Sequence, residues 1–82
     1  MGYRSLVMPE LGLDGRVAVR LGLWLVQQGQ QVEVDQSLAE IVAGEIVIDL
    51  PSPVDGVFVE RLVDEDEPIS IGQELGRIES VA

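Results

Sequence analysis

The side chains of this chain that could do chemistry are carboxylates. Four of its 15 acids stand together at Asp64–Glu67, and two more, Glu33 and Asp35, are two positions apart. Adjacent carboxylates can attract Ca²⁺, and a spaced pair can act as acid and base on a glycosidic bond. A calcium loop, however, spaces its ligands at alternate positions, whereas neighbours in an extended chain point to opposite sides. We therefore expect Asp64–Glu67 to be a solvated acidic loop, and Glu33 and Asp35 to lie on a solvated face.

The reactive side chains that most enzymes use are missing. The 82 residues include no cysteine and no histidine, and all five basic residues are arginines, so there is no lysine. The chain therefore lacks a thiol, a side-chain amine and the imidazole that serves most often as a general base. No phosphate loop, G-x-S-x-G or H-E-x-x-H motif is present. We expect that this protein is not an enzyme.

Charge and hydropathy argue against a nucleic-acid-binding protein and against a membrane protein. The net charge is −10, and 46% of the residues are apolar. An acidic chain has no basic face for nucleic acid or for an anionic membrane. The longest apolar run, Leu23–Val26, is much shorter than the roughly 20 residues of a membrane helix, and no signal-peptide pattern opens the chain. We expect a single folded domain over residues 1–82, located in the cytoplasm.

Alternation, not helical spacing, dominates the apolar pattern. Residues 17–21, 32–34, 46–50 and 57–60 alternate or are rich in β-branched side chains, and glycines and prolines separate them. Such patterns predict short strands of about five residues joined by turns. Roughly eight strands in one small domain require two packed sheets or a flattened barrel.

The chain also repeats itself. Residues 24–41 align without gaps on residues 61–78, with five identities and two exchanges of valine for isoleucine, at an offset of 37 residues (61 − 24 = 37). Because the matches fall mostly on apolar positions, each half should supply the same inward side chains. The halves should then be related by a pseudo-two-fold axis, with the joining segment, residues 42–49, at the end opposite both termini.

The joining segment has the composition of a tight hairpin. Gly44 and Glu45 interrupt a run of apolar residues, and Val42 and Val47 flank them. Glycine can take a positive φ at the first central position, as a type II′ turn requires, while the flanking valines favour extended backbone. We expect a short, exposed turn with Gly44 and Glu45 at its tip.

Five segments, in order along the chain, together carry a family resemblance. They are Val7-Met8-Pro9-Glu10-Leu11-Gly12; Trp24-Leu25-Val26 with Gly29 and Val32; Leu38-Ala39-Glu40-Ile41; Leu50-Pro51-Ser52-Pro53 with Gly56-Val57; and Ile71-Gly72-Gln73-Glu74-Leu75 with Ile78-Glu79. The sequence resembles the biotinyl/lipoyl family, and within it the lipoyl domains of 2-oxo acid dehydrogenase acyltransferases. The stretch 13–20 fits least well. The resemblance implies an all-β flattened barrel, a barrel-sandwich hybrid of two four-stranded antiparallel sheets with internal pseudo-two-fold symmetry.

The resemblance also locates a departure from the family. In the family an Asp-Lys pair at the tip of the central hairpin receives lipoic acid, and the biotinyl branch has Met-Lys-Met. Counting from the flanking segments places the attachment lysine at Glu45 and its aspartate at Gly44. Attachment needs an amine that forms an amide with an activated carboxyl, and a carboxylate cannot do this. We therefore expect no lipoyl or biotinyl cofactor, no metal and no cofactor-binding residue.

Two functions stay open on this basis. The first is a non-catalytic interaction module whose partners are proteins or neighbouring domains of a multienzyme assembly. The alternative is a carrier domain of a 2-oxo acid dehydrogenase complex whose lysine was lost or mutated. Glu45 is then either a feature that a partner recognises or a solvated turn residue.

Trp24 is either a stacking platform or a core residue, and its repeated apolar neighbours favour the core. The module of a bacterial efflux adaptor is disfavoured, since those proteins insert a long helical hairpin at this tip.

Overall fold

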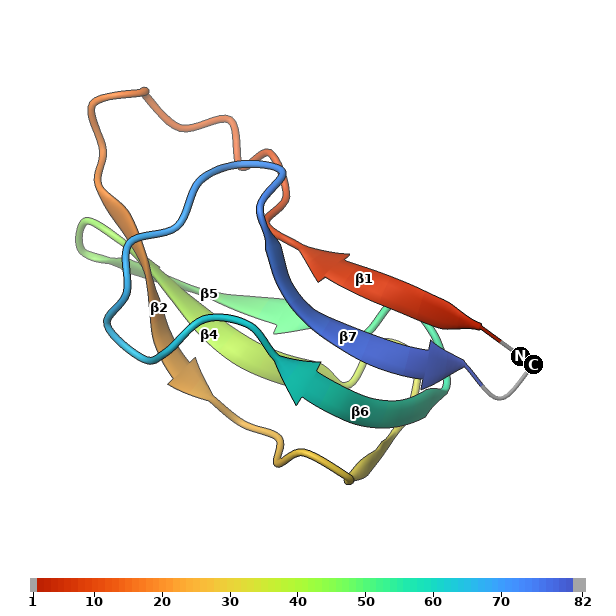
Figure 1. The fold of residues 1–82 in the computed structure, drawn as a ribbon. Coiled ribbons are helices and arrows are strands. Elements are labelled where there is room, and N and C mark those ends of the chain that lie inside the picture. The colour runs from red at the N-terminus through yellow and green to blue at the C-terminus, as the bar shows by residue number, and fades with distance from the viewer. Residues whose placement is uncertain (1, 81–82) are drawn as a thin grey trace.

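The structure, a computed structural model that describes residues 2–80, contains only β-strands and their connections (Figure 1). The strands are β1 (Tyr3–Val7), β2 (Val19–Trp24), β3 (Gln31–Val32), β4 (Ser37–Ala43), β5 (Ile46–Pro51), β6 (Gly56–Arg61) and β7 (Glu74–Ser80). They form a four-stranded sheet in the order β1-β7-β6-β3 and a three-stranded sheet in the order β2-β4-β5, and every pairing is antiparallel. Within residues 2–80 there is no helix long and apolar enough to span a membrane. The predicted all-β barrel-sandwich architecture is confirmed.

The core lies between the two sheets. Its fully buried side chains come from both of them, for example Leu21 and Ile41 from the three-stranded sheet and Phe58 from the four-stranded sheet. The rings of Trp24 and Phe58 lie 5.2 Å apart at an angle of 43°. The Trp24 indole N–H donates a hydrogen bond to the carbonyl oxygen of Val63 at 3.0 Å. Trp24 is thus a core residue whose polar edge is satisfied, as its position in the repeat predicts.

The pseudo-two-fold relation extends to the backbone. Outside glycine, left-handed φ angles occur within the described residues only at Asp35 (69°) and Asp66 (70°). At the offset of 37 residues these positions correspond to Gly72 (φ 83°) and Gly29 (φ 90°). The same turn geometry therefore recurs in both halves, once with glycine and once with aspartate, the two residue types that tolerate this region best.

The three-stranded sheet differs from the predicted four strands by one. In the second half of the chain, Pro68 is the repeat counterpart of Gln31 in β3, and it forms only a single bridge, to Arg20 of β2. The N–H of Ile69 donates to the carbonyl of Val19 at 3.1 Å. Proline has no N–H to extend the ladder further, so the eighth strand is reduced to this bridge.

The acidic loop Asp64–Glu67 lies where the repeat places it, between β6 and the bridge at Pro68. Two of its carboxylates are engaged in contacts: Asp66 pairs with Arg20 at 2.8 Å, and Glu65 accepts the backbone N–H of Trp24 at 2.9 Å. Within residues 2–80 no three carboxylates are grouped in a way that could hold a metal ion. The loop follows β6 of the four-stranded sheet, and these contacts partly fix it to β2 of the three-stranded sheet.

A network of polar side chains crosses the four-stranded sheet. Arg77 of β7 contacts Glu60 of β6 and Glu74 of β7, each at 3.2 Å, and the hydroxyl of Ser5 on β1 donates to Glu74. The Arg77 guanidinium, and after it the Ser5 hydroxyl, lowers the pKa of Glu74 below its ordinary value of 4.5. A lowered pKa contributes stability above the unfolded-state pKa, and this contribution disappears as the pH falls through the folded-state pKa.

We predict that Glu74→Gln makes the acid limb of the stability curve shallower. The urea midpoint of the native chain should exceed that of the variant above pH 4.5, and the gap should close as the pH falls below it, because the native carboxylate is then protonated. The effect should be modest, since the group is exposed to solvent screening. Glu33→Gln, at an exposed carboxylate without a side-chain hydrogen bond or ion pair in the described structure, is the control. A gap of constant size at all pH values would contradict the assignment.

Candidate functional site

The turn that joins the two halves of the chain is the candidate site. Strands β4 and β5 pair up to Ala43 and Ile46, leaving Gly44 and Glu45 as a two-residue turn. Gly44 has a φ of 63°, and Glu45 is not among the left-handed residues, which agrees with the predicted type II′ turn. Figure 1 shows this turn at the end of the barrel opposite the start of β1 and the end of β7. Both turn residues are exposed, as predicted.

The loop between β1 and β2 supports the tip from one side. The N–H of Gly44 points to the carbonyl of Ala18 at 3.4 Å. A β-carbon at Gly44 would lie 3.7 Å from Cγ1 of Val17, which is ordinary van der Waals contact. The turn thus projects from the barrel and is held by the β1–β2 loop, and Glu45 is its exposed second residue.

The tip exposes one carboxylate next to two apolar side chains. The Glu45 carboxylate has no hydrogen bond or ion pair in the part of the chain that the structure describes. Next to it, Ile46 and Val47 are 53% and 58% exposed, although both are large and apolar. General acid–base or nucleophilic chemistry would need a second converging group, which the tip lacks.

Two further carboxylates lie on the outer face of this hairpin, and we did not single them out from the sequence. Glu40 of β4 is directly opposite Asp49 of β5 in the register. Both point away from the core, because their neighbours Ile41 and Leu50 are buried. Like charges directly opposite each other are destabilising across strands, and neither has a hydrogen bond or ion pair within residues 2–80. A cationic partner would relieve this repulsion. Knowledge of the strand register would have revealed the pair.

The fold consists of two repeated halves joined by a protruding hairpin. The profile of the biotin/lipoyl family, described as "Biotin-requiring enzyme", matches residues 4–78, and the chain belongs to this family. The lipoyl domain of the 2-oxoglutarate dehydrogenase complex from Azotobacter vinelandii has the same fold: its TM-score is 0.72 at 18% identity, covering 93% of this chain and 98% of that one.

Two relatives extend the likeness to acyltransferases. The dihydrolipoyllysine-residue acetyltransferase component of the pyruvate dehydrogenase complex of Corynebacterium glutamicum is 39% identical over 71 residues, which is 87% of this chain and 10% of that protein. The lipoamide acyltransferase component of the branched-chain alpha-keto acid dehydrogenase complex of Pseudomonas aeruginosa is 35% identical over 79 residues, or 96% and 18%. The chain thus spans less than a fifth of the length of either relative. Both relatives are components of multienzyme complexes.

Proposed function

We propose that this domain is a non-catalytic protein-interaction module of lipoyl-domain shape that carries neither lipoyl nor biotinyl group. The observation that carries the proposal is the combination at the β4–β5 turn. The projecting hairpin of the family is retained, yet Glu45 occupies the position at which the family resemblance places the attachment lysine. A carboxylate cannot form the amide that tethers either cofactor, and no lysine is present elsewhere in the chain to replace it.

The surface chemistry of the hairpin supports an interaction role. Exposed Ile46 and Val47 offer apolar area, and the unpaired carboxylates of Glu40, Glu45 and Asp49 offer negative charge. The partner would be a protein or a neighbouring domain of a multienzyme assembly in the cytoplasm, with basic and apolar groups on the complementary surface.

A catalytic role has no support at these residues. Histidine, cysteine and lysine are absent, so turnover would have to come from carboxylates and hydroxyl groups alone. The common nucleophile–base pairs, which use a histidine, cysteine or lysine, are therefore not available. A substrate panel that revealed turnover abolished by a single carboxylate substitution would overturn this part of the proposal.

We predict that the chain stays unmodified when it is produced together with a lipoate ligase and lipoic acid. Intact-protein mass spectrometry should show the mass of the bare polypeptide, because ligation needs a side-chain amine that the sequence lacks. A lysine-bearing lipoyl domain expressed in the same cells is the positive control. A lipoyl-sized addition to the native chain would refute the proposal.

The retained hairpin and the likeness to acyltransferase components favour one alternative, a carrier domain that has lost its lysine. The double variant Gly44→Asp/Glu45→Lys separates the two functions. An interaction module that diverged long ago should be neither lipoylated efficiently nor reductively acylated by a 2-oxo acid dehydrogenase after the lysine is restored. Efficient reaction in both steps would instead support the carrier domain with a recent loss.

A further inference from the structure

The loop between β1 and β2 is longer than its counterpart in the other half of the chain. Met8 and Ser52 occupy equivalent positions in the two halves of the chain. The N–H of Met8 donates to the carbonyl oxygen of Gln73 at 2.9 Å, and the N–H of Ser52 donates to the carbonyl oxygen of Gln36 at 2.8 Å. These two acceptors are themselves repeat mates (73 − 36 = 37). Met8 and Ser52, however, are 44 residues apart (52 − 8 = 44), so the first loop holds seven residues that its counterpart lacks (44 − 37 = 7). The symmetry of the barrel breaks here.

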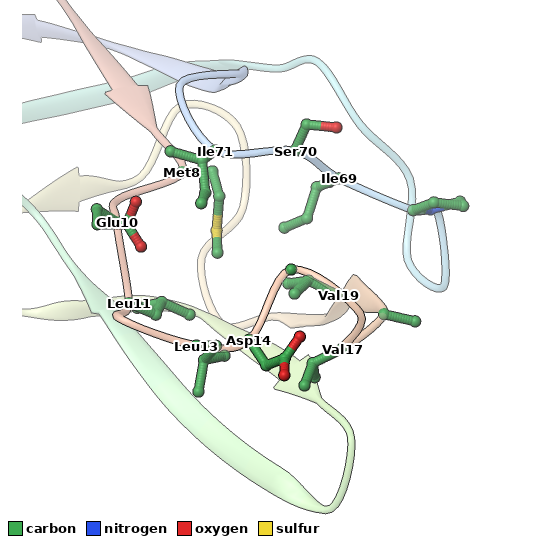
Figure 2. Close-up of a pocket in the computed structure, with 13 residues that line it drawn as sticks. Met8, Glu10, Leu11, Leu13, Asp14, Val17, Val19, Ile69, Ser70 and Ile71 are labelled. Atoms are coloured by element: carbon green, nitrogen blue, oxygen red, sulfur yellow. The ribbon is translucent and has the colours of Figure 1, made fainter.

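The longer loop forms one wall of an apolar pocket of about 370 Å³ (Figure 2). Leu11, Leu13 and Val17 line it from the loop, and Met8 and Ile69 line it from the core. Figure 2 shows the side chains of Met8 and Ile69 directed into the space that the loop encloses. This volume lies in the range of pockets that bind small groups, roughly 300–1,000 Å³. The pocket is large enough for one bulky aliphatic side chain.

The rim of the pocket is acidic. Glu10 and Asp14 are exposed on the same loop. Asp14 pairs with Arg16 at 3.0 Å, whereas the Glu10 carboxylate accepts only the backbone N–H of Gly12, at 2.9 Å, and faces no cation in the described structure. With a chain charge of −10, the groups that complement this rim are cationic.

We infer that the pocket receives a leucine-sized side chain from a partner polypeptide that carries arginine or lysine next to it. This inference rests on the proposed interaction function and specifies where the partner docks. A polypeptide fits the site better than a free amphiphile does. Val17 and Ala18 line the pocket and also contact the turn at Gly44, so an extended segment could cover both the pocket and the exposed apolar residues Ile46 and Val47.

Three capped tripeptides test the inference when they are titrated into the ¹⁵N-labelled chain: acetyl-Arg-Leu-Arg-amide, acetyl-Arg-Ala-Arg-amide and acetyl-Glu-Leu-Glu-amide. The first should cause saturable amide shifts at residues 8–18 and 68–71. The alanine peptide should bind at least about tenfold more weakly, because it loses the burial of a leucine side chain. The glutamate peptide should also bind several-fold more weakly. Added salt should weaken binding of the two arginine peptides and not that of the glutamate peptide, because only the arginine peptides are attracted by the negative charge of the chain.

Matched variants test whether the arginine–leucine peptide binds in this pocket. Ile71 lines the pocket and is 59% exposed, while its repeat mate Val34 (71 − 37 = 34) is 50% exposed at a position without the long loop. Ile71→Ser should weaken binding of the arginine–leucine peptide by about threefold or more through loss of apolar contact, and Val34→Ser should leave it unchanged. Glu10→Gln should likewise weaken binding, with Glu33→Gln as its control. Both members of each pair are exposed, so all four variants should fold.

Several outcomes would overturn the inference. These are equal binding of the three peptides, shifts confined to other parts of the barrel, and equal effects of Ile71→Ser and Val34→Ser. Binding of isoamylammonium as tight as that of the arginine–leucine peptide would assign the pocket to a free amphiphilic cation. The two proposals fail separately. Loss of peptide binding in a chain of unmodified mass contradicts the pocket alone, whereas a lipoyl-sized mass addition contradicts the proposed function alone.

Discussion

Replacing Phe58 with alanine should lower the free energy of unfolding by about 3–5 kcal/mol. The side chain is fully buried, contacts the ring of Trp24 and stands opposite Ile78 in the β6–β7 register. Its ring also fills the space above Gly76, where an added β-carbon would come within 2.9 Å of Cε1. Truncation therefore leaves a cavity between the Trp24 ring and the backbone at Gly76.

The loss is large in proportion to the stability of the whole domain. A small domain has a total free energy of unfolding of only about 5–15 kcal/mol, so Phe58→Ala should also lower the melting temperature by roughly 15–30 °C. Urea titration and calorimetry measure both quantities. Tyr3→Ala is the matched control: this aromatic side chain is 66% exposed and its loss should change stability by no more than about 0.5 kcal/mol. Similar losses in the two variants would show that the core is not centred on Phe58.

Gly56→Ala should destabilise the barrel by about 3 kcal/mol, at the upper end of overpacking costs. A β-carbon at this position would lie 2.1 Å from the carbonyl oxygen of Glu79 and 3.0 Å from Cγ2 of Ile78. The oxygen belongs to the β6–β7 ladder, where Gly56 pairs with Ser80. It cannot move without disturbing that pairing. The clash is therefore with backbone, which is less adaptable than the end of a flexible side chain.

The control for this variant is Gly15→Ala. Nothing lies within 4 Å of a β-carbon at Gly15, and its φ is outside the left-handed region. Alanine there should be neutral or stabilising by up to about 1 kcal/mol, because it restricts the unfolded chain. Urea midpoints of the two variants measure the difference. Equal midpoints would contradict the close approach of β6 and β7 at Gly56.

Glu45, at the tip of the β4–β5 turn, should contribute little to the stability of the barrel. Glu45 is exposed and makes no hydrogen bond or ion pair in the described part of the chain. Substitutions at such surface positions usually change stability by less than about 0.5 kcal/mol. A change of residue at position 45 should therefore alter the tip of the hairpin without weakening the scaffold.

Local patterns in the sequence determined the architecture. Alternation predicted strands, the 37-residue repeat predicted two equivalent halves, and Gly44 predicted the turn between them. Each of these signals concerns neighbouring residues or a fixed offset, so it can be read without coordinates. The absence of lysine at position 45 is likewise a property of the sequence alone.

Tertiary structure decided the features that depend on residues far apart in the chain. The expected strand at residues 17–21 begins only at Val19, because Asp14 holds the preceding turn by accepting the N–H of Val17 on its carbonyl. The opposition of Glu40 and Asp49 depends on register, and the reduced eighth strand depends on where Pro68 meets β2. The pocket arises where residues 8–18 meet residues 68–71. Loops have no periodicity, so their contacts follow from packing and not from local sequence.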